Sequence, residues 1–280
     1  MIESFQQILK TINSIKELKV GIILLMILIG IAIFAPLIAT HDPYVLNDEM
    51  IAKPSSKYIF GTDGLGRDVF SMVVYGSRTS LKIGIIAAAI SSVIGTLIGG
   101  VAGYIGGKVD KVISEIINMF LMLPTFFLIL IVVAIYGSSL TNIIIVIGIT
   151  SWTGTARLMR AQAISLRERT FIKSAKTIGE SEMGILFRHI IPNGIFPIIA
   201  DSTMSVSSAI LSEAGLSFIG LGDPNVVSWG QIIAHGKGYL LRGWWICTFS
   251  GLAIVFTVIS FYLIGEGMNH ILSPKLNKIK

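Results

Sequence analysis

The sequence predicts an all-α membrane protein, a polytopic bundle of about six transmembrane helices. Two features of the composition point to this class: 53% of the 280 residues are hydrophobic and only 14% are charged, about half the charged fraction of a typical soluble domain. In addition, the apolar residues gather into runs of about 20 residues, the length that crosses a bilayer as a helix. Helices are the expected spanning form because backbone in lipid must satisfy its hydrogen bonds within its own segment.

Six apolar runs are predicted to cross the membrane. Four of them are long and strongly apolar, whereas the fourth run in the chain is short and the fifth contains several serines. The six are Val20–Thr40, Leu81–Tyr104, Val112–Tyr136, Leu140–Ala156, Ile195–Ala214 and Trp244–Gly265. The tryptophan pair that opens the last run is placed where an interfacial aromatic belt is expected.

The distribution of basic residues predicts the orientation. Six crossings put both termini on one side, and under that layout 15 Lys and Arg fall on the side of the termini and seven on the other. Because the more basic side of such a protein faces the cytoplasm, we expect a multi-pass protein of the cell membrane, plasma or inner, with both termini in the cytoplasm.

The chain shows no pattern of a catalytic, nucleotide or metal site. Gly107 and Lys108 invite a phosphate-loop reading, but Ala102 stands where that loop needs its first glycine and Val109 where it needs a hydroxyl residue. A tight cytoplasmic turn explains the glycines better. The four histidines are spread over both membrane faces, no nucleophile motif surrounds any serine, and the single cysteine has no partner. We therefore expect no catalytic, cofactor-binding or metal-binding residues.

A polar face on the fifth run is the best candidate for a translocation path. Asp201, Ser205, Ser208 and Ser212 are spaced by four, three and four residues, so at 100° per residue they fall within about 60° of one another on a helix. Ionisable residues inside a membrane are costly and usually face a path or a partner. Hydrogen bonding between helices of a bundle also favours small polar residues, and it is an equally good explanation.

The cytoplasmic segment between the fourth and fifth runs is patterned rather than a plain linker. Phe171, Ala175 and Ile178 form a short apolar stripe, Gly179 follows where a glycine commonly ends a helix in the left-handed conformation, and Pro192 stands where a helix start tolerates proline. A short helix with one apolar face beside the membrane suits docking into a groove on a partner protein.

This segment resembles the cytoplasmic loop of the membrane subunits of ATP-binding-cassette (ABC) importers. The loop of that family reads Glu-Ala-Ala, three residues, Gly, nine residues, Ile, one residue, Leu-Pro. The spacing is kept here, although Glu, the first Ala, Ile and Leu are replaced. The corresponding residues are Lys173, Ser174, Ala175, Gly179, His189, Ile191 and Pro192.

Other motifs are similar to the dipeptide, oligopeptide and nickel branch of the family, and the resemblance extends over roughly residues 60–274. The N-terminal span followed by a long outer loop is similar to the second, C-type subunit of the permease pair in that branch. The motifs are Gly61–Asp68, Ser165–Arg169, Arg188–Asn193, Leu216–Gly222 and Ser228–Gly230.

The resemblance implies a MetI-like ABC permease fold and a machine of several subunits. A second homologous permease, two ABC ATPases that hold ATP and Mg, and an extracytoplasmic substrate-binding protein are the expected partners, with membrane lipid around the chain and no nucleic acid. The loop would couple ATP hydrolysis in the partners to transport. The residues implied in this coupling are Phe171, Lys173, Ser174, Ala175, Ile178, Gly179, His189 and Pro192.

The same resemblance divides the chain into three parts. Residues 1–80 form a cytoplasmic tail, the first span and a long extracytoplasmic loop, residues 81–272 form the permease core with its coupling loop 157–193, and residues 273–280 form a cytoplasmic tail. The expected solutes are di- and oligopeptides, with nickel or a metal chelate as the alternative. From other classes, an ion-coupled secondary transporter, a channel and a membrane scaffold remain alternatives.

Overall fold

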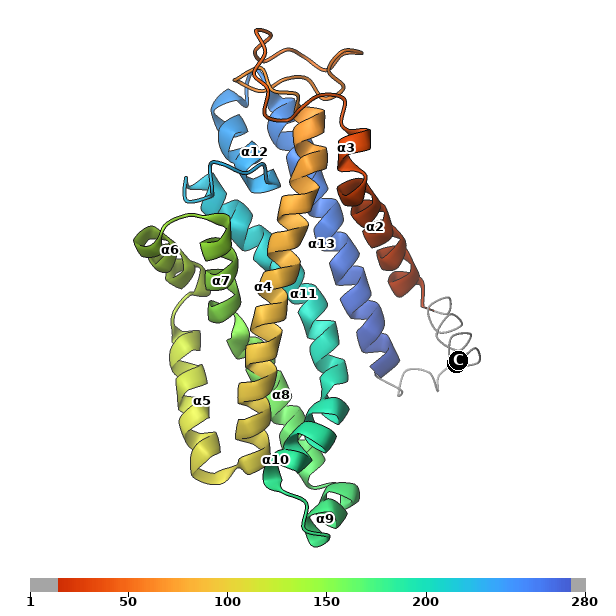
Figure 1. Cartoon of the computed structure of the whole chain (residues 1–280), viewed down its shortest axis with the longest axis vertical. Coiled ribbons are helices and arrows are strands. Elements are labelled where there is room, and N and C mark those ends of the chain that lie inside the picture. The colour runs from red at the N-terminus through yellow and green to blue at the C-terminus, as the bar shows by residue number, and fades with distance from the viewer. Residues whose placement is uncertain (1–14, 273–280) are drawn as a thin grey trace.

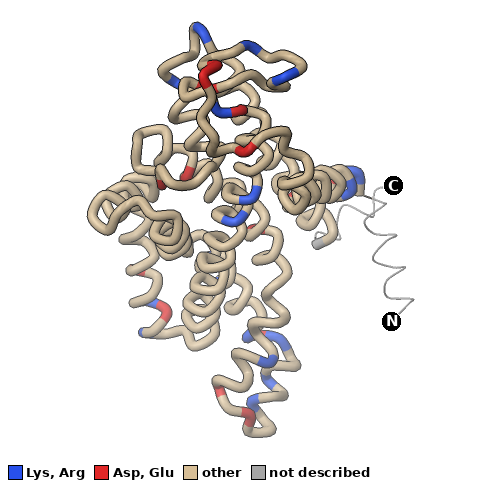
Figure 2. The backbone as a smooth tube through the Cα atoms, turned by 45° about the horizontal axis from the view of Figure 1, so that its top comes forward, with Lys and Arg blue, Asp and Glu red and all other residues tan. Residues whose placement is uncertain are grey.

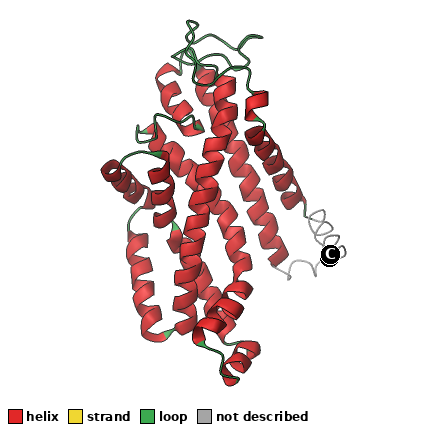
Figure 3. Ribbon diagram, viewed as in Figure 1, coloured by secondary structure: helices red, strands yellow, loops and turns green. Residues whose placement is uncertain are grey.

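The computed structural model describes residues 15–272, and within this range every regular element is a helix (Figure 3). The predicted all-α class is therefore confirmed, while the predicted tail 273–280 lies outside the described residues. In chain order the elements are α2 Lys16–Ile33, α3 Ala35–Ile38, α4 Val69–Ile105, α5 Gly107–Met122, α6 Thr125–Tyr136, α7 Leu140–Thr150, α8 Trp152–Arg167, α9 Thr170–Thr177, α10 Glu182–Ile185, the π-helical turn η1 Leu186–Ile190, α11 Ile191–Phe218, α12 Trp229–Gly236, the 3₁₀ turn η2 Lys237–Tyr239 and α13 Trp244–Leu272.

Helix α4 is the centre of the bundle. In Figure 1 it runs the length of the molecule, with α2 and α13 on one side and α5 to α7 on the other, and α9 hangs at the far end. Its most extensive packing is against α8, followed by α11 and α7, while α13 packs against α2 and α11. The elements that carry the predicted functional residues, α9 and α11, are thus both positioned by this central helix and its neighbours.

The contact between α4 and α8 depends on three glycines spaced four residues apart. A Cβ added to Gly99 would lie 2.2 Å from the carbonyl oxygen of Ala156, and one added to Gly103 would lie 2.3 Å from that of Arg160. At Gly95 the nearest atom would be Cβ of Thr155, at 2.7 Å. Small residues at this spacing let two helix backbones approach closely in a membrane.

Within residues 15–272, four helical stretches are long and apolar enough to cross a membrane: Val69–Ile105, Leu140–Arg167, Glu182–Phe218 and Trp244–Ile271. The bent pair α5–α6 makes a fifth if it is taken as one span. Helix α2 is a further apolar helix of 18 residues, with Glu17 in its first turn. The predicted number of about six spans is therefore approximate.

The prediction of one continuous helix over Val112–Tyr136 is wrong. The segment is bent by 82° between α5 and α6, at Leu123 and Pro124, which both adopt extended backbone angles. Proline cannot donate a backbone hydrogen bond, and it disfavours the helical conformation in the residue before it. The apolar composition of the segment gives no sign of this break in the helix.

Two helices extend beyond the predicted spans, because hydropathy marks the apolar part of a helix and not its end. Helix α4 begins at Val69, well before the predicted span at Leu81, and Asp68 caps it by accepting a hydrogen bond from the Ser71 backbone N–H at 2.9 Å. Helix α8 continues past Ala156, where the fourth predicted span ends, to Arg167. A bidentate ion pair between Arg160 and Asp110 of α5 accompanies this polar extension.

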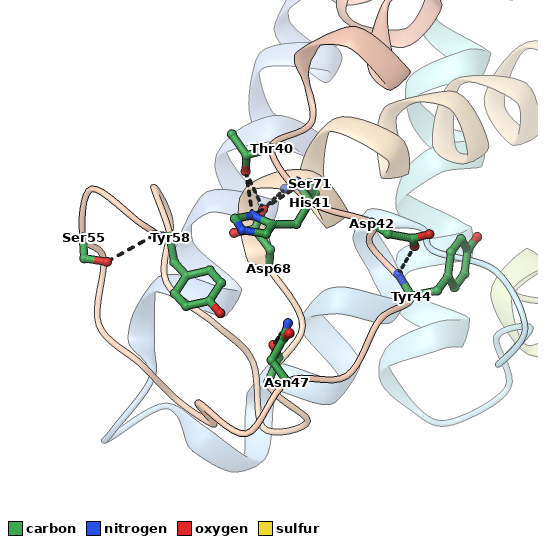
Figure 4. Close-up of polar contacts among 10 residues, drawn as sticks. Thr40, His41, Asp42, Tyr44, Asn47, Ser55, Tyr58, Asp68 and Ser71 are labelled. Atoms are coloured by element: carbon green, nitrogen blue, oxygen red, sulfur yellow. Dashed lines mark hydrogen bonds and ion pairs between the residues drawn. The ribbon is translucent and has the colours of Figure 1, made fainter.

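The long loop between α3 and α4 is fastened to the start of α4 by a buried carboxylate. Asp68 is fully buried, and its Oδ2 also accepts hydrogen bonds from the hydroxyls of Ser71 at 2.6 Å and Thr40 at 3.1 Å (Figure 4). The backbone N–H of His41 donates to Ser71 Oγ, and the His41 ring lies at 35° to the Tyr58 ring, with 5.1 Å between the ring centroids. The two ends of the loop are therefore held together.

Glycine is required within this loop. Gly66 has a φ of +76°, and a Cβ there would lie 1.9 Å from the carbonyl oxygen of Asn47. The Asn47 side chain in turn donates to the Gly66 carbonyl at 3.0 Å. The motif Gly61–Asp68 is thus an ordered part of the loop that covers one end of the helix bundle. Figure 2 shows that Lys and Arg gather on this loop and at the opposite, α8–α9 end.

We predict that Gly99→Val destabilises the folded protein by about 3 kcal/mol or more, at the upper end of the cost of overpacking. The valine side chain would have to push the α8 backbone away from α4. The midpoint of thermal unfolding of the detergent-solubilised protein measures the effect. Gly251→Val is the matched control, because a Cβ on Gly251 in α13 meets no atom within 4 Å. Equal midpoints for the two variants would contradict the proposed role of this contact.

Candidate functional site

Two side chains on one face of α9 pack this helix against the rest of the bundle. Ile172 is completely buried and Ala175 is 6% exposed. Both join a cluster that contains Tyr104 of α4, Met159 of α8 and Leu186 of η1. The helix is therefore packed onto the ends of α4 and α8 rather than free on a flexible loop.

The predicted apolar stripe of α9 is divided between two faces. Ala175 points to the body, whereas Phe171 and Ile178 are 45% and 82% exposed. Sequence analysis missed Ile172, although its position three residues before Ala175 was a signal of a shared inner face. The outer face, with Phe171, Lys173, Ser174 and Ile178 exposed, is the part of the predicted coupling set that a partner can reach.

The turn after α9 links it to the helix that enters the membrane. Gly179 ends α9 with a φ of +83°, as predicted, and the backbone N–H of Glu180 donates to the Ala175 carbonyl at 3.1 Å. The Glu180 carboxylate then lies 2.9 Å from His189 Nε2 and 3.7 Å from Arg188 Nη1. Sequence analysis missed Glu180; an acid directly after the terminating glycine was the available signal.

Two lysines of α9 form ion pairs at the surface, and one of them also contacts a buried aromatic ring. Lys173 pairs with Glu168 at 3.4 Å and Lys176 with Glu182 at 3.6 Å. Exposed pairs of this kind each contribute only about 0–1 kcal/mol. The Lys176 ammonium also lies 5.0 Å above the ring of the buried Tyr104, a cation–π contact that joins α9 to the end of α4.

Helix α10 continues into the π turn η1, which lies directly before α11. His189 lies in this turn, its ring 6.5 Å from the ring of Phe171, and Pro192 is near the first residue of α11. Proline has no N–H to continue the α-helical ladder, and π turns are frequently found at functional sites. The structure thus brings all eight predicted coupling residues to one end of the molecule. Their coupling role stays a prediction.

The predicted path residues on α11 have two different environments. Asp201 accepts a hydrogen bond from Thr155 of α8 at 2.8 Å, so this side chain makes a bond between helices. The three serine hydroxyls donate to carbonyls one turn earlier in their own helix. Ser205 and Ser208 line a small cavity shared with α4 and the α7–α8 junction, and Ser212 does not. A path role stays a prediction for all four.

A buried carboxylate that sequence analysis missed connects two of the motifs. Glu213 of α11 is 3% exposed, and its Oε1 accepts hydrogen bonds from the hydroxyls of Ser217 and Ser228, each at 2.7 Å. Ser228 also caps α12, because its oxygen accepts from the Gln231 backbone N–H at 3.1 Å. An acid inside an apolar span, with a serine one turn later, was the signal in the sequence.

Glycines let the backbone come close to this carboxylate. A Cβ on Gly230 would lie 2.7 Å from Cα of Ala214 and 3.0 Å from Glu213 Oε2, and one on Gly222 would lie 2.1 Å from Ser217 Oγ. In the loop between α11 and α12, Asp223 accepts a hydrogen bond from the first N–H of α7 at 2.8 Å. The loop therefore joins α11 to the starts of both α7 and α12.

Comparison with known proteins assigns the family. Residues 95–278 match the family described as binding-protein-dependent transport system inner membrane component. The probable D,D-dipeptide transport system permease protein of Escherichia coli strain K12 is 39% identical over 257 residues, which are 91% of this chain and 85% of the relative. The chain belongs to this family. It is a permease subunit with several membrane-crossing helices.

Further relatives and a solved structure agree with this assignment. The permease is 38% identical to the dipeptide transport system permease protein of Alkalihalophilus pseudofirmus, over 98% of this chain and 90% of that one. It is 39% identical to the glutathione transport system permease protein of Escherichia coli O6:K15:H31, over 89% and 84%. A solved inward-facing methionine ABC transporter shares its fold, with a TM-score of 0.56 at 21% identity over 72% of this chain and 94% of that one. The MetI-like fold is therefore confirmed.

We predict that Glu213→Ala lowers the thermal unfolding midpoint of the permease more than Glu213→Gln does. The alanine leaves two buried hydroxyls without their acceptor, at a cost of about 1–3 kcal/mol for each unsatisfied group, whereas the glutamine amide oxygen can still accept. Glu266→Ala is the control, because Glu266 of α13 is half-exposed and its ion pair within residues 15–272 is with His270. A Glu213→Ala midpoint equal to that of Glu266→Ala would show that this carboxylate is dispensable.

Proposed function

We propose that this permease is one of two membrane-spanning subunits of an ABC importer that moves di- and oligopeptides into the cell. The substrate class rests on the relatives, which are named for D,D-dipeptide, dipeptide and glutathione transport and align with most of the chain. Glutathione is itself a tripeptide, so the three names share one chemistry. An extracytoplasmic binding protein delivers the peptide, and a second homologous permease completes the path.

The coupling role is inferred from the packing of α9, which buries one face of the helix and exposes the other. One face is anchored through Ile172 and Ala175, and the other presents Phe171 and Ile178. An exposed apolar pair on a rigid helix is suited to insertion in a groove of a partner. On this proposal the partner is an ABC ATPase, two of which bind ATP and Mg, while the permease binds no nucleotide and catalyses no reaction.

Motion of α9 has two routes into the membrane. The first is the apolar cluster with the ends of α4 and α8. The second is the Glu180–His189 contact, because His189 belongs to the helical stretch Glu182–Phe218 that continues into α11. A displacement of α9 by closing ATPases is thereby passed to the helix that carries the proposed path residues. With α9 in the cytoplasm, both termini of the permease are cytoplasmic and the outer loop faces the binding protein.

We predict that Phe171→Asp reduces peptide uptake at least tenfold, while Phe171→Leu keeps most of it. A carboxylate buried without a partner in the ATPase groove costs several kcal/mol, and about 1.4 kcal/mol already corresponds to tenfold. The measurement is ATP-driven uptake of radiolabelled Ala-Ala by proteoliposomes that contain both permeases, both ATPases and the binding protein.

Control measurements separate coupling from folding. The amounts of inserted permease and of co-purified ATPase are compared for the two variants and the unmodified chain. Wild-type uptake by correctly inserted Phe171→Asp would refute the coupling role of this face. Absence of peptide uptake by the unmodified, complete transporter would instead refute the substrate class.

A further inference from the structure

A small cavity between three helices has an unusual lining. Its volume is about 150 Å³, several times the roughly 30 Å³ that one water molecule occupies in the liquid. Four serine side chains contribute to it, together with small apolar residues and one isoleucine, and none of the lining residues carries a formal charge. The lining residues are Ala87, Ala88, Ser91, Ile147, Ser151, Ser205, Ser208 and Ala209.

Ser91 of α4 stands out among the buried serines. Its side chain is 1% exposed, yet among the described residues its hydroxyl has no hydrogen-bond partner. The equally buried Ser77 of α4 and Ser250 of α13 donate to carbonyls of their own helices, at 2.6 Å and 3.0 Å. Because an unsatisfied buried hydroxyl is costly, a hydroxyl that lines a cavity without a partner points to an occupant with a polar group.

The other hydroxyls of the cavity have a complementary character. Ser205 and Ser208 donate their hydrogens to α11 carbonyls, which leaves the oxygen lone pairs as acceptors. Ser91 has both its hydrogen and its lone pairs available. The site therefore offers acceptors together with the free donor of Ser91 and the hydroxyl of Ser151, and no charge, so it favours a neutral group that contains both an N–H and a C=O.

We propose that this serine cavity is a subsite that hydrogen-bonds the peptide backbone of the solute in transit. The proposal rests on the proposed function and deepens it. An amide unit carries the matching donor and acceptor and is common to all peptides, whatever their side chains. The small alanines leave room for the backbone to approach. Ser208 is exposed on α11, which places the mouth of the cavity at the surface of the subunit.

The first experiment compares Ser91→Thr with Ser91→Val in the complete transporter with its binding protein. The two side chains have nearly the same shape, but only threonine keeps the hydroxyl. We expect Ser91→Val to lower the uptake of Ala-Ala relative to Ser91→Thr by roughly two- to tenfold, the value of one hydrogen bond. ATP hydrolysis stimulated by the loaded binding protein should be equal in the two variants. The pair Ser250→Thr and Ser250→Val controls for loss of a buried serine outside the cavity.

The second experiment tests occupancy directly. Ser208→Cys and, as the control on the same helix, Ser212→Cys are made in a Cys247→Ala background and treated with a membrane-permeant maleimide during Ala-Ala transport. We expect turnover with Ala-Ala to slow modification at position 208 and not at position 212. Equal uptake by Ser91→Thr and Ser91→Val, with no protection at position 208, would overturn the subsite while peptide import by the unmodified chain upholds the proposed function.

Discussion

Two helices in a bilayer gain little by hiding apolar side chains from each other, because the lipid around them is equally apolar. Close packing has to replace the hydrophobic effect, and α4 and α8 achieve it through the glycines at 95, 99 and 103. The rest of the bundle depends on this contact. It fixes the polar end of α8 beside α5, where Arg160 meets Asp110, and it brings together the two helix ends that α9 covers.

A consequence of this arrangement is that α9 packs against several helices and does not stand apart as a peripheral loop. The same short helix contacts α4 through Tyr104, α8 through buried apolar side chains, and the start of α11 through the turn at Glu180. A force applied to α9 therefore acts on several crossing helices at once. The opposite end of the bundle is organised by different means, with buried carboxylates at Asp68 and Glu213 that accept hydrogen bonds from hydroxyls of separate segments.

The sequence predicted those features that follow from local periodicity and composition. The helical class, the end of α9 at Gly179 and the tight turn between α4 and α5 all follow from residues close together in the chain. The pairing of Glu213 with Ser228 was not predictable in this way, because Ser228 lies 15 residues after Glu213 and a loop separates them. The inner face of α9 was misjudged for the same reason: amphipathic spacing shows that a face exists, but the neighbouring helices decide which side is covered.

Asp201 illustrates the limit most clearly. The spacing on α11 grouped it with three serines, yet its carboxylate accepts a hydrogen bond from Thr155 on another helix. The serines at 205 and 208 instead line a cavity together with Ser91 and Ser151, which come from distant segments. Composition and spacing along one helix cannot reveal which neighbouring helix meets which part of a polar face. The family motifs identified the protein, and the geometry showed how those motifs meet in space.

The π turn at Leu186–Ile190 has a consequence for rotational phase. It lies inside one continuous helical stretch from Glu182 to Phe218, and a π turn contains one more residue than an α turn. That extra residue rotates everything after it by about 100° about the helix axis. The direction in which α11 presents Ser205 and Ser208 therefore depends on the turn that contains His189, well before these serines in the chain.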